Sequence, residues 1–147
     1  MESQSLLRLA LIANAGFSAL TGAACYLLDD AVARWTGLPA DALASLGLEL
    51  GLFAIGLGFL ASRRDLSAPW IRRTVAAVIA IDALWVVGSV LFLLSANSLT
   101  VAGQWTVGLV AVAVADFEVF QTIGWRGLTR RAADRPISLA AAAPSDA

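Results

Sequence analysis

Four side chains with strong hydrogen-bonding groups interrupt otherwise apolar stretches of this sequence: Asn14, Glu49, Asp82 and Asp116. If each stretch is a helix that rises ~1.5 Å per residue, all four lie ~13–18 Å from the arginine-rich ends of those stretches. Polar groups that meet at one depth can share protons, bind a ligand or fix the register of helices. We therefore take these four residues as the centre of a candidate site.

Trp85 is the fifth principal residue of the candidate site, because it follows Asp82 at i+3 on the same helical face. Glu118 and Gln121 are secondary members and occupy a face nearly opposite to Asp116. A carboxylate at the centre of a bilayer costs at least ~2.5–3.5 kcal/mol, so it faces the bundle interior or is protonated. Because the basic residues of the apolar stretches lie only at their ends, none is near these acids in depth, and we expect the acids to bond to one another or to amide side chains.

Three interpretations of this polar cluster compete. In the first, which we favour from the sequence, hydrogen bonds of about 0.6–2 kcal/mol between helices fix the bundle. In the second, the acids form a proton- or cation-linked site. In the third, they anchor an apolar ligand such as a lipid or quinone, with Trp85 and Phe120 as walls. A metal site is not expected, because the Glu-x-x-His pattern of di-iron bundles is missing.

The amino-acid composition excludes much catalytic chemistry. The 147 residues include no histidine and no lysine, and Cys25 is the single cysteine. An intrachain disulfide, a Cys–His nucleophile, a structural zinc site, a Schiff base and a P-loop lysine are therefore excluded. We expect no cofactor and no nucleic-acid partner. Enzymatic activity ranks last among the interpretations, because no nucleophile–base pair is visible.

Four apolar segments must position these residues. The chain is 59% hydrophobic and 14% charged, whereas soluble domains are roughly half apolar and a quarter charged. A membrane span needs ~20 apolar residues, and segments 6–28, 43–61, 71–95 and 99–124 meet that need. We predict an all-α, up-down-up-down bundle of four transmembrane helices in one domain, 1–128, with a tight turn at 96–98. A disordered cytoplasmic tail, 129–147, is expected to follow.

The distribution of arginine predicts the orientation in the membrane. Nine of the ten basic residues flank one side of the predicted spans, and Arg34 alone lies on the other side. Because cytoplasmic loops carry the excess of basic residues, both termini are predicted to be cytoplasmic. The size and the Arg/Ala-rich composition favour a bacterial inner membrane.

Small residues mark where helices can approach closely. The second span carries Gly47, Gly51, Ala54 and Gly58 at helical spacing, and the first two form a GxxxG pair. Such residues allow close backbone contact between helices in lipid. We favour packing within the bundle, and a homo-oligomer seam or a different membrane partner stays open.

Three short motifs in the first half of the chain are Asn14-Ala-Gly-Phe-Ser-Ala-Leu-Thr-Gly22, Gly37-Leu-Pro39 and Gly47-Leu-Glu49-Leu-Gly51. Together they resemble small bacterial four-helix membrane proteins of the DoxX-like type. The segment Ile81-Asp82-Ala-Leu-Trp85 resembles the third helix of uncharacterised proteins of similar size. The resemblance to DoxX-like proteins implies a membrane subunit or accessory factor, in some cases linked to quinone or thiol redox chemistry. Only Glu49 matches a residue associated with that group, and a single thiol gives no dithiol mechanism.

The sequence therefore predicts an accessory or scaffold-type inner-membrane protein whose polar cluster is structural. A small proton- or cation-coupled carrier or channel component, using Glu49, Asp82 and Asp116, is the alternative. Binding of a lipid or quinone is the further alternative.

Overall fold

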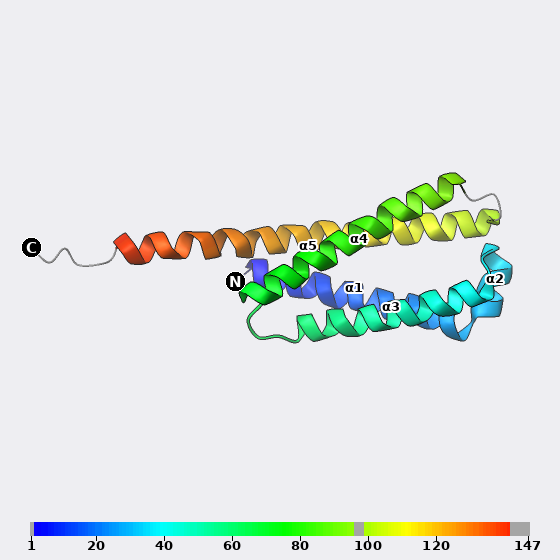
Figure 1. Cartoon of the computed structure of the whole chain (residues 1–147), viewed down its shortest axis with the longest axis horizontal. Helices are drawn as coiled ribbons and strands as arrows, with labels where there is room; N and C mark the ends of the chain where they lie inside the picture. Colours follow the sequence, from blue (N-terminus) through cyan, green and yellow to red (C-terminus); the bar gives the residue numbers. More distant parts are fainter. Residues whose placement is uncertain (1, 96–98, 142–147) are drawn as a thin grey trace, which may run out of the picture.

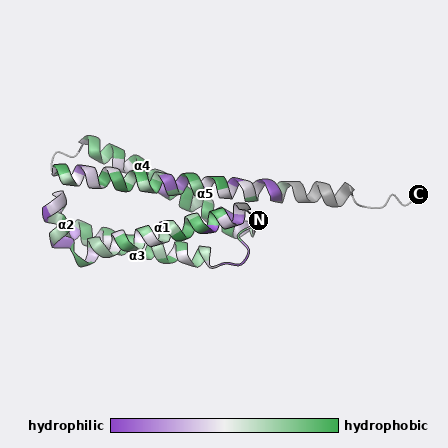
Figure 2. Ribbon diagram, turned by 180° about the vertical axis from the view of Figure 1, so that it is seen from behind, coloured by the Kyte–Doolittle hydropathy of each residue, from purple (hydrophilic) through white to green (hydrophobic). Residues whose placement is uncertain are grey.

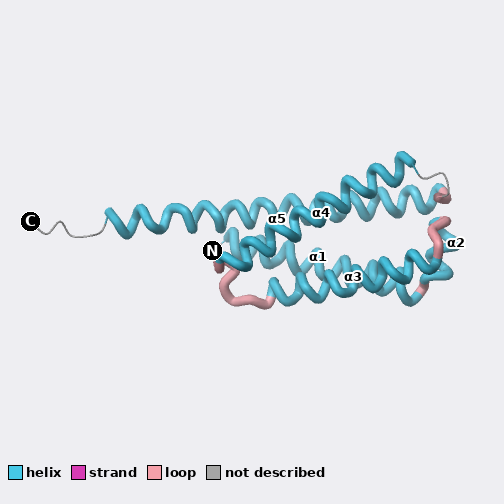
Figure 3. Tube along the Cα trace, viewed as in Figure 1, coloured by secondary structure: helices cyan, strands magenta, loops and turns pink. Residues whose placement is uncertain are grey.

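A computed structural model of the chain describes residues 2–95 and 99–141, and these residues form helices joined by loops (Figures 1 and 3). The helices are α1 (Glu2–Leu27), α2 (Asp29–Thr36), α3 (Ala40–Ala61), α4 (Pro69–Ser95) and α5 (Val101–Ala141). The predicted turn at 96–98 and the tail residues 142–147 lie outside the described residues.

Four of the helices contain stretches long and apolar enough to cross a membrane: Ser3–Leu27, Ala40–Ala61, Pro69–Ser95 and Val101–Arg131. Apolar residues cover most of their length, while polar residues gather on α2 and on the part of α5 that extends beyond the bundle (Figure 2). The all-α fold class is confirmed, and the four apolar helices indicate contact with a lipid bilayer.

The structure differs from the sequence prediction at two places. Residues 29–36, expected as a loop, form the short helix α2, which begins with Asp29 and Asp30 and carries Arg34 in its last turn. These charges suit the helix dipole at both ends. The last helix continues to Ala141, whereas we predicted disorder from residue 129. Arginine and alanine, frequent in this extension, are good helix formers.

The helices pack in an order that leaves α3 and α4 with little direct contact along their length. α1 packs against α3 and α5, and α5 packs against α4, which gives the order α3–α1–α5–α4. Loop 62–68 brings α3 and α4 together at one end, and α4 then rises away from α3 toward the α2 end (Figure 1). The space between α3 and α4 is therefore the natural place for an opening in the bundle.

The apolar core lies at the closed end, beside loop 62–68. Its members come from every long helix and from the loop: Leu7, Leu11, Leu57, Leu60, Ala61, Leu66, Ile71, Val75, Val78 and Leu128. The α1 helix also holds the loop directly, because Arg8 Nη2 donates a hydrogen bond to the Arg63 carbonyl at 2.7 Å. Gln4 Nε2 donates another to the Arg64 carbonyl at 2.8 Å. Packing and hydrogen bonds thus close this end of the bundle.

The short helix α2 ties the opposite end together. Gly37 ends α2 with a φ of 82° and donates its backbone N–H to the Ala33 carbonyl, a left-handed conformation that glycine adopts without steric cost. The Thr36 carbonyl accepts a hydrogen bond from the Thr100 N–H at 3.0 Å. Gly103 lies so close that a Cβ there would be 2.1 Å from the Thr36 oxygen. The α2 helix is therefore fixed to the start of α5.

A polar cluster and a cavity in the bundle

Asp82 is the centre of a hydrogen-bonded cluster between three helices. Asn14 Nδ2 on α1 donates to Asp82 Oδ2 at 2.9 Å, and Gln121 Nε2 on α5 donates to the same oxygen at 3.4 Å. Ser18, one turn after Asn14, donates its hydroxyl to Asn14 Oδ1 at 3.3 Å. The cluster joins α1, α4 and α5; Asn14 and Asp82 lie near the middle of their spans, and Gln121 lies five residues beyond the middle of its span.

These side chains are almost completely withdrawn from the surface. Asp82 is 3% exposed, Asn14 is 1% exposed and Gln121 is 0% exposed. Two acceptor oxygens of these side chains nevertheless receive no hydrogen bond from the described part of the protein. Gln121 Oε1 is buried without a partner, and within the described residues Asp82 Oδ1 accepts no hydrogen bond, since both donors end on Oδ2. Buried polar groups normally have partners, so these atoms suggest a place for a further group.

A cavity of about 150 Å³ lies against Asp82 and is lined by all four long helices. Its walls are mainly apolar, and the lining residues are Asn14, Phe17, Ser18, Thr21, Leu46, Glu49, Leu50, Phe53, Ile81, Asp82, Trp85, Val110 and Val114. Among these, Glu49 on α3 and Ile81 on α4 are also exposed at the surface. The cavity therefore opens between α3 and α4, on the side of the bundle that faces lipid.

A second, larger hollow continues from the first along the gap between α3 and α4. It has a volume of about 340 Å³, and Leu46 and Trp85 line both spaces. Its other walls are mainly apolar residues of α3 and α4, with Leu38 from the loop before α3, Val107 from α5, and Ser89 as a small polar exception. The two hollows together form an elongated space with its polar groups at one end and apolar walls along the rest.

The structure brings together four of the five principal residues of the predicted site. Asn14 and Asp82 are hydrogen-bonded, and Glu49 and Trp85 line the same cavity. The fifth, Asp116, does not join them: it lies exposed on α5.

The α5 contribution to the cluster comes from Gln121 instead, which the sequence placed in a secondary role. Five residues separate Asp116 and Gln121, which is ~140° around a helix of 3.6 residues per turn. Only one of the two can face the interior, and the packing of α5 on α1 and α4 selects Gln121. Glu118 is half-buried on α5 and lines neither hollow.

The aromatic walls also differ from the prediction. Phe120 is 50% exposed and does not line the cavity. Phe17 and Phe53 take that place beside Trp85, and Phe17 packs against Phe117 with ring centroids 5.6 Å apart. Phe17 and Ser18 follow Asn14 at i+3 and i+4, on the same side of α1, whereas the position of Phe53 depends on how α3 packs.

The predicted glycine seam divides into two parts. Gly47 packs closely against α1, where its Cβ would lie 2.7 Å from the Gly22 carbonyl oxygen. Gly51 and Gly58 have nothing within 4 Å of an added Cβ, and they line shallow grooves on the outer side of α1 and α3. The first glycine of the GxxxG pair thus serves packing within the bundle, and the second faces outward.

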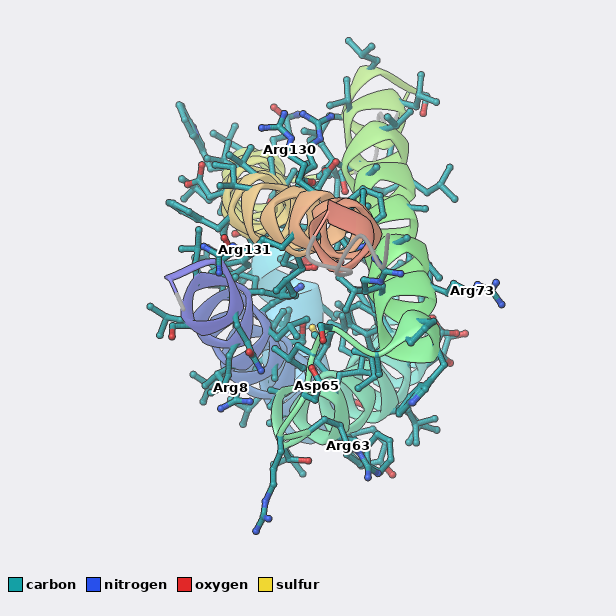
Figure 4. All side chains as sticks on the ribbon, turned by 90° about the vertical axis from the view of Figure 1, so that its left-hand side faces the viewer. Arg8, Arg63, Asp65, Arg73, Arg130 and Arg131 are labelled. Carbon is teal, nitrogen blue, oxygen red and sulfur yellow. The ribbon has the colours of Figure 1, made fainter. Side chains whose placement is uncertain are left out.

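The arginine-rich end of the bundle is separate from this cavity. Figure 4 views that end and shows Arg8 on α1, Arg63 on the loop after α3, and Arg73 pointing outward from α4. None of the cavity-lining residues is basic. In the described part of the chain, no group of three or more Cys, Asp or Glu side chains is placed to hold a metal ion.

The fold and the site together define a helical membrane bundle with a polar cluster at the base of a laterally open cavity. Comparison of the chain with known protein families, with curated proteins and with solved structures gave no match. The functional argument therefore depends on the geometry of the site.

Proposed function

We propose that this protein binds a small, largely apolar molecule that enters from the bilayer between α3 and α4 and places its polar group against Asp82. The observation that carries the proposal is the position of Asp82. Asp82 is only 3% exposed, yet it lines an open, mainly apolar cavity, and one of its carboxyl oxygens receives no hydrogen bond from the described residues. Apolar walls with a few convergent polar groups are typical of ligand pockets.

The size of the space supports a ligand with a compact head and an apolar remainder. An apolar cavity of ~150 Å³ is large enough for a benzene-sized group. The adjoining hollow of about 340 Å³ extends the space toward the α2 end. A ring-sized head next to Asp82 and an apolar tail between α3 and α4 would fill both.

A cavity-filling substitution on α3 tests this proposal. Leu46 lines both hollows, so Leu46→Trp should obstruct them, whereas Leu48→Trp places the same side chain at a position that is 58% exposed. Native mass spectrometry of each protein, extracted gently from its own membrane, should find a bound small molecule in the wild type and in Leu48→Trp. The molecule should be absent from Leu46→Trp. Equal retention in both variants, or no bound molecule in the wild type, would refute the proposal.

A second candidate function, that of an accessory subunit, is favoured by Asp116. This carboxyl lies midway along the span Val101–Arg131 and is exposed. A carboxyl at that depth is costly against lipid, so contact with another polypeptide or a second copy would stabilise it. The outward-facing Gly51 and Gly58 offer a further place for close approach of a helix.

A photocrosslinking amino acid at Val112 distinguishes contact with another polypeptide from contact with lipid alone. Val112 is one turn from Asp116 and 60% exposed. The accessory function predicts a covalent adduct with a defined polypeptide. Adducts with lipid alone would contradict it. The same probe at Leu84, which is 71% exposed on α4, serves as the control.

Location and orientation belong to the same proposal. The excess of arginine at one end supports cytoplasmic termini and a bacterial inner membrane. A fluorescent protein fused to the C-terminus should fluoresce, because the usual green fluorophore forms in the cytoplasm; a dark fusion would contradict this orientation. The resemblance to DoxX-like proteins stays a prediction from the sequence.

A further inference from the structure

Charge is distributed unevenly around the cavity. Glu49 and Asp82 both line it, and no basic side chain does. In the sequence, the only arginines within the helices that form its walls are Arg8, Arg72, Arg73 and those from Arg126 onward, all toward the closed end. A carboxylate in an apolar surrounding is stabilised when a positive group lies beside it. The protein supplies no such group within the cavity.

Aromatic rings surround the same space. Phe17, Phe53 and Trp85 line the cavity together with the two acids, one ring from each of α1, α3 and α4. Aromatic faces attract ammonium groups, and tryptophan does so most strongly. The strength of this attraction rises when the cation has been removed from water. Carboxylates and aromatic rings are thus combined around one small volume.

The two acids lie at different depths in the cavity. Glu49 is exposed at the mouth, and Asp82 lies 3% exposed at the inner end of the same cavity. A molecule that enters from the bilayer therefore passes one acid before it reaches the other. Asn14 and Gln121 hold Oδ2 of the inner acid, which leaves Oδ1 for the ligand.

From these observations we infer that the ligand is an organic cation, namely an amine or quaternary ammonium with a ring-sized head and an apolar tail. This inference depends on the proposed binding function and names the class of molecule bound. A neutral lipid or quinone would use the hydrogen-bonding capacity of Asp82 but not the charge of the two acids or the aromatic faces. An anionic lipid headgroup would be repelled by both acids.

Two probe molecules of nearly equal shape distinguish binding of an organic cation from binding of a neutral molecule. Phenyltrimethylammonium and tert-butylbenzene differ in a positive nitrogen against a neutral carbon at the branch point. The protein is placed in nanodiscs of phosphatidylcholine, and binding is followed by the indole N–H signal of Trp85 in NMR, assigned by Trp85→Phe. Concentrations are expressed in the lipid phase. Of the five tryptophans, only Trp85 lines the cavity, so the other four report nonspecific effects.

The expected result is saturable binding of the cation, at least about tenfold tighter than that of the neutral probe. That ratio corresponds to ~1.4 kcal/mol. Asp82→Asn and Glu49→Gln should each weaken cation binding several-fold. Asp116→Asn, which removes a carboxyl midway along α5 but outside the cavity, should leave it unchanged. Glu49 lies exposed, so Glu49→Gln gives a folded variant even if Asp82→Asn loses stability, and circular dichroism verifies the fold of each.

Equal or tighter binding of tert-butylbenzene would overturn the inference of a cation while leaving the proposed binding of an apolar molecule intact. Unchanged cation binding in both Asp82→Asn and Glu49→Gln would also overturn it. Failure of both probes to bind would overturn it as well, and the proposed function would then be decided by the molecule retained in Leu48→Trp and lost in Leu46→Trp.

Discussion

Alanine substitutions at Gly47 and Gly51 should have opposite effects on stability, although the two residues are one turn apart on α3. A Cβ at Gly47 would lie 2.7 Å from both the Gly22 carbonyl oxygen and the Tyr26 backbone nitrogen. Backbone atoms of α1 cannot move away as the end of a flexible side chain can. A Cβ at Gly51 would have nothing within 4 Å. The pair therefore compares one closely packed position with one open position in the same helix.

The expected change in stability is the sum of two opposing free-energy contributions, the helix propensity of alanine and the steric cost of its methyl group. Alanine is better than glycine in a helix by ~0.8–1.0 kcal/mol in water, a gain available at both positions. Inserting a methyl group into a closely packed contact costs about 1–3 kcal/mol. Against backbone at 2.7 Å, the upper half of that range applies, which leaves Gly47→Ala less stable by ~1–2 kcal/mol. Gly51→Ala should be unchanged or slightly more stable.

Thermal unfolding in detergent micelles, followed by circular dichroism, measures the difference. Gly47→Ala should unfold at a lower temperature than the wild type, and Gly51→Ala at the same or a higher temperature. Equal destabilisation by both would refute the assignment of Gly47 to the α1–α3 contact and of Gly51 to the open surface. In native membranes, a loss of stability confined to Gly51→Ala would instead indicate that another helix occupies the outer groove.

Two further predictions use the same measurement. Gly103→Ala should destabilise the bundle by at least ~2 kcal/mol, because its Cβ would lie 2.1 Å from the Thr36 carbonyl oxygen, while Gly108→Ala, with nothing within 4 Å, should not. Asn14→Leu should cost about 1–3 kcal/mol, because it removes the 2.9 Å hydrogen bond to Asp82 and leaves a buried acceptor short of a donor. Asp82→Asn keeps an acceptor for that donor and should cost less; a larger loss for Asp82→Asn would contradict this assignment.

The sequence was sufficient to predict the helical spans, because lipid imposes a simple rule on length and composition. Each of the four long helices contains its predicted span to within a few residues. The pairing of Asn14 with Asp82 also agrees with the sequence argument, because both lie near the middle of their spans and no basic partner is available. Depth along a helix can be counted from the sequence without knowledge of packing.

The sequence does not show in the same way how a helix is rotated about its axis, and therefore which of its faces points into the bundle. The apolar residues of α5 surround the helix nearly evenly, so its hydrophobic pattern does not identify an inward face. The sequence therefore favoured Asp116 on its depth alone, and only the contacts of α5 with α1 and α4 show that Gln121 faces the interior. The identity of the residues on the cavity wall, such as Phe53, depends on the same rotational choice in α3.

The separate environments of Asp82 and Asp116 have a consequence for function. Both lie near the middle of a span, but Asp82 receives two hydrogen bonds from neighbouring helices, whereas Asp116 faces outward. Exposure of a carboxyl to the bilayer centre is costly, so each acid requires its own means of stabilisation. For Asp82 the bundle supplies two amide donors. The Asp116 side chain receives no hydrogen bond from the described residues, so the proposed partner at Asp116 is compatible with the proposed ligand at Asp82.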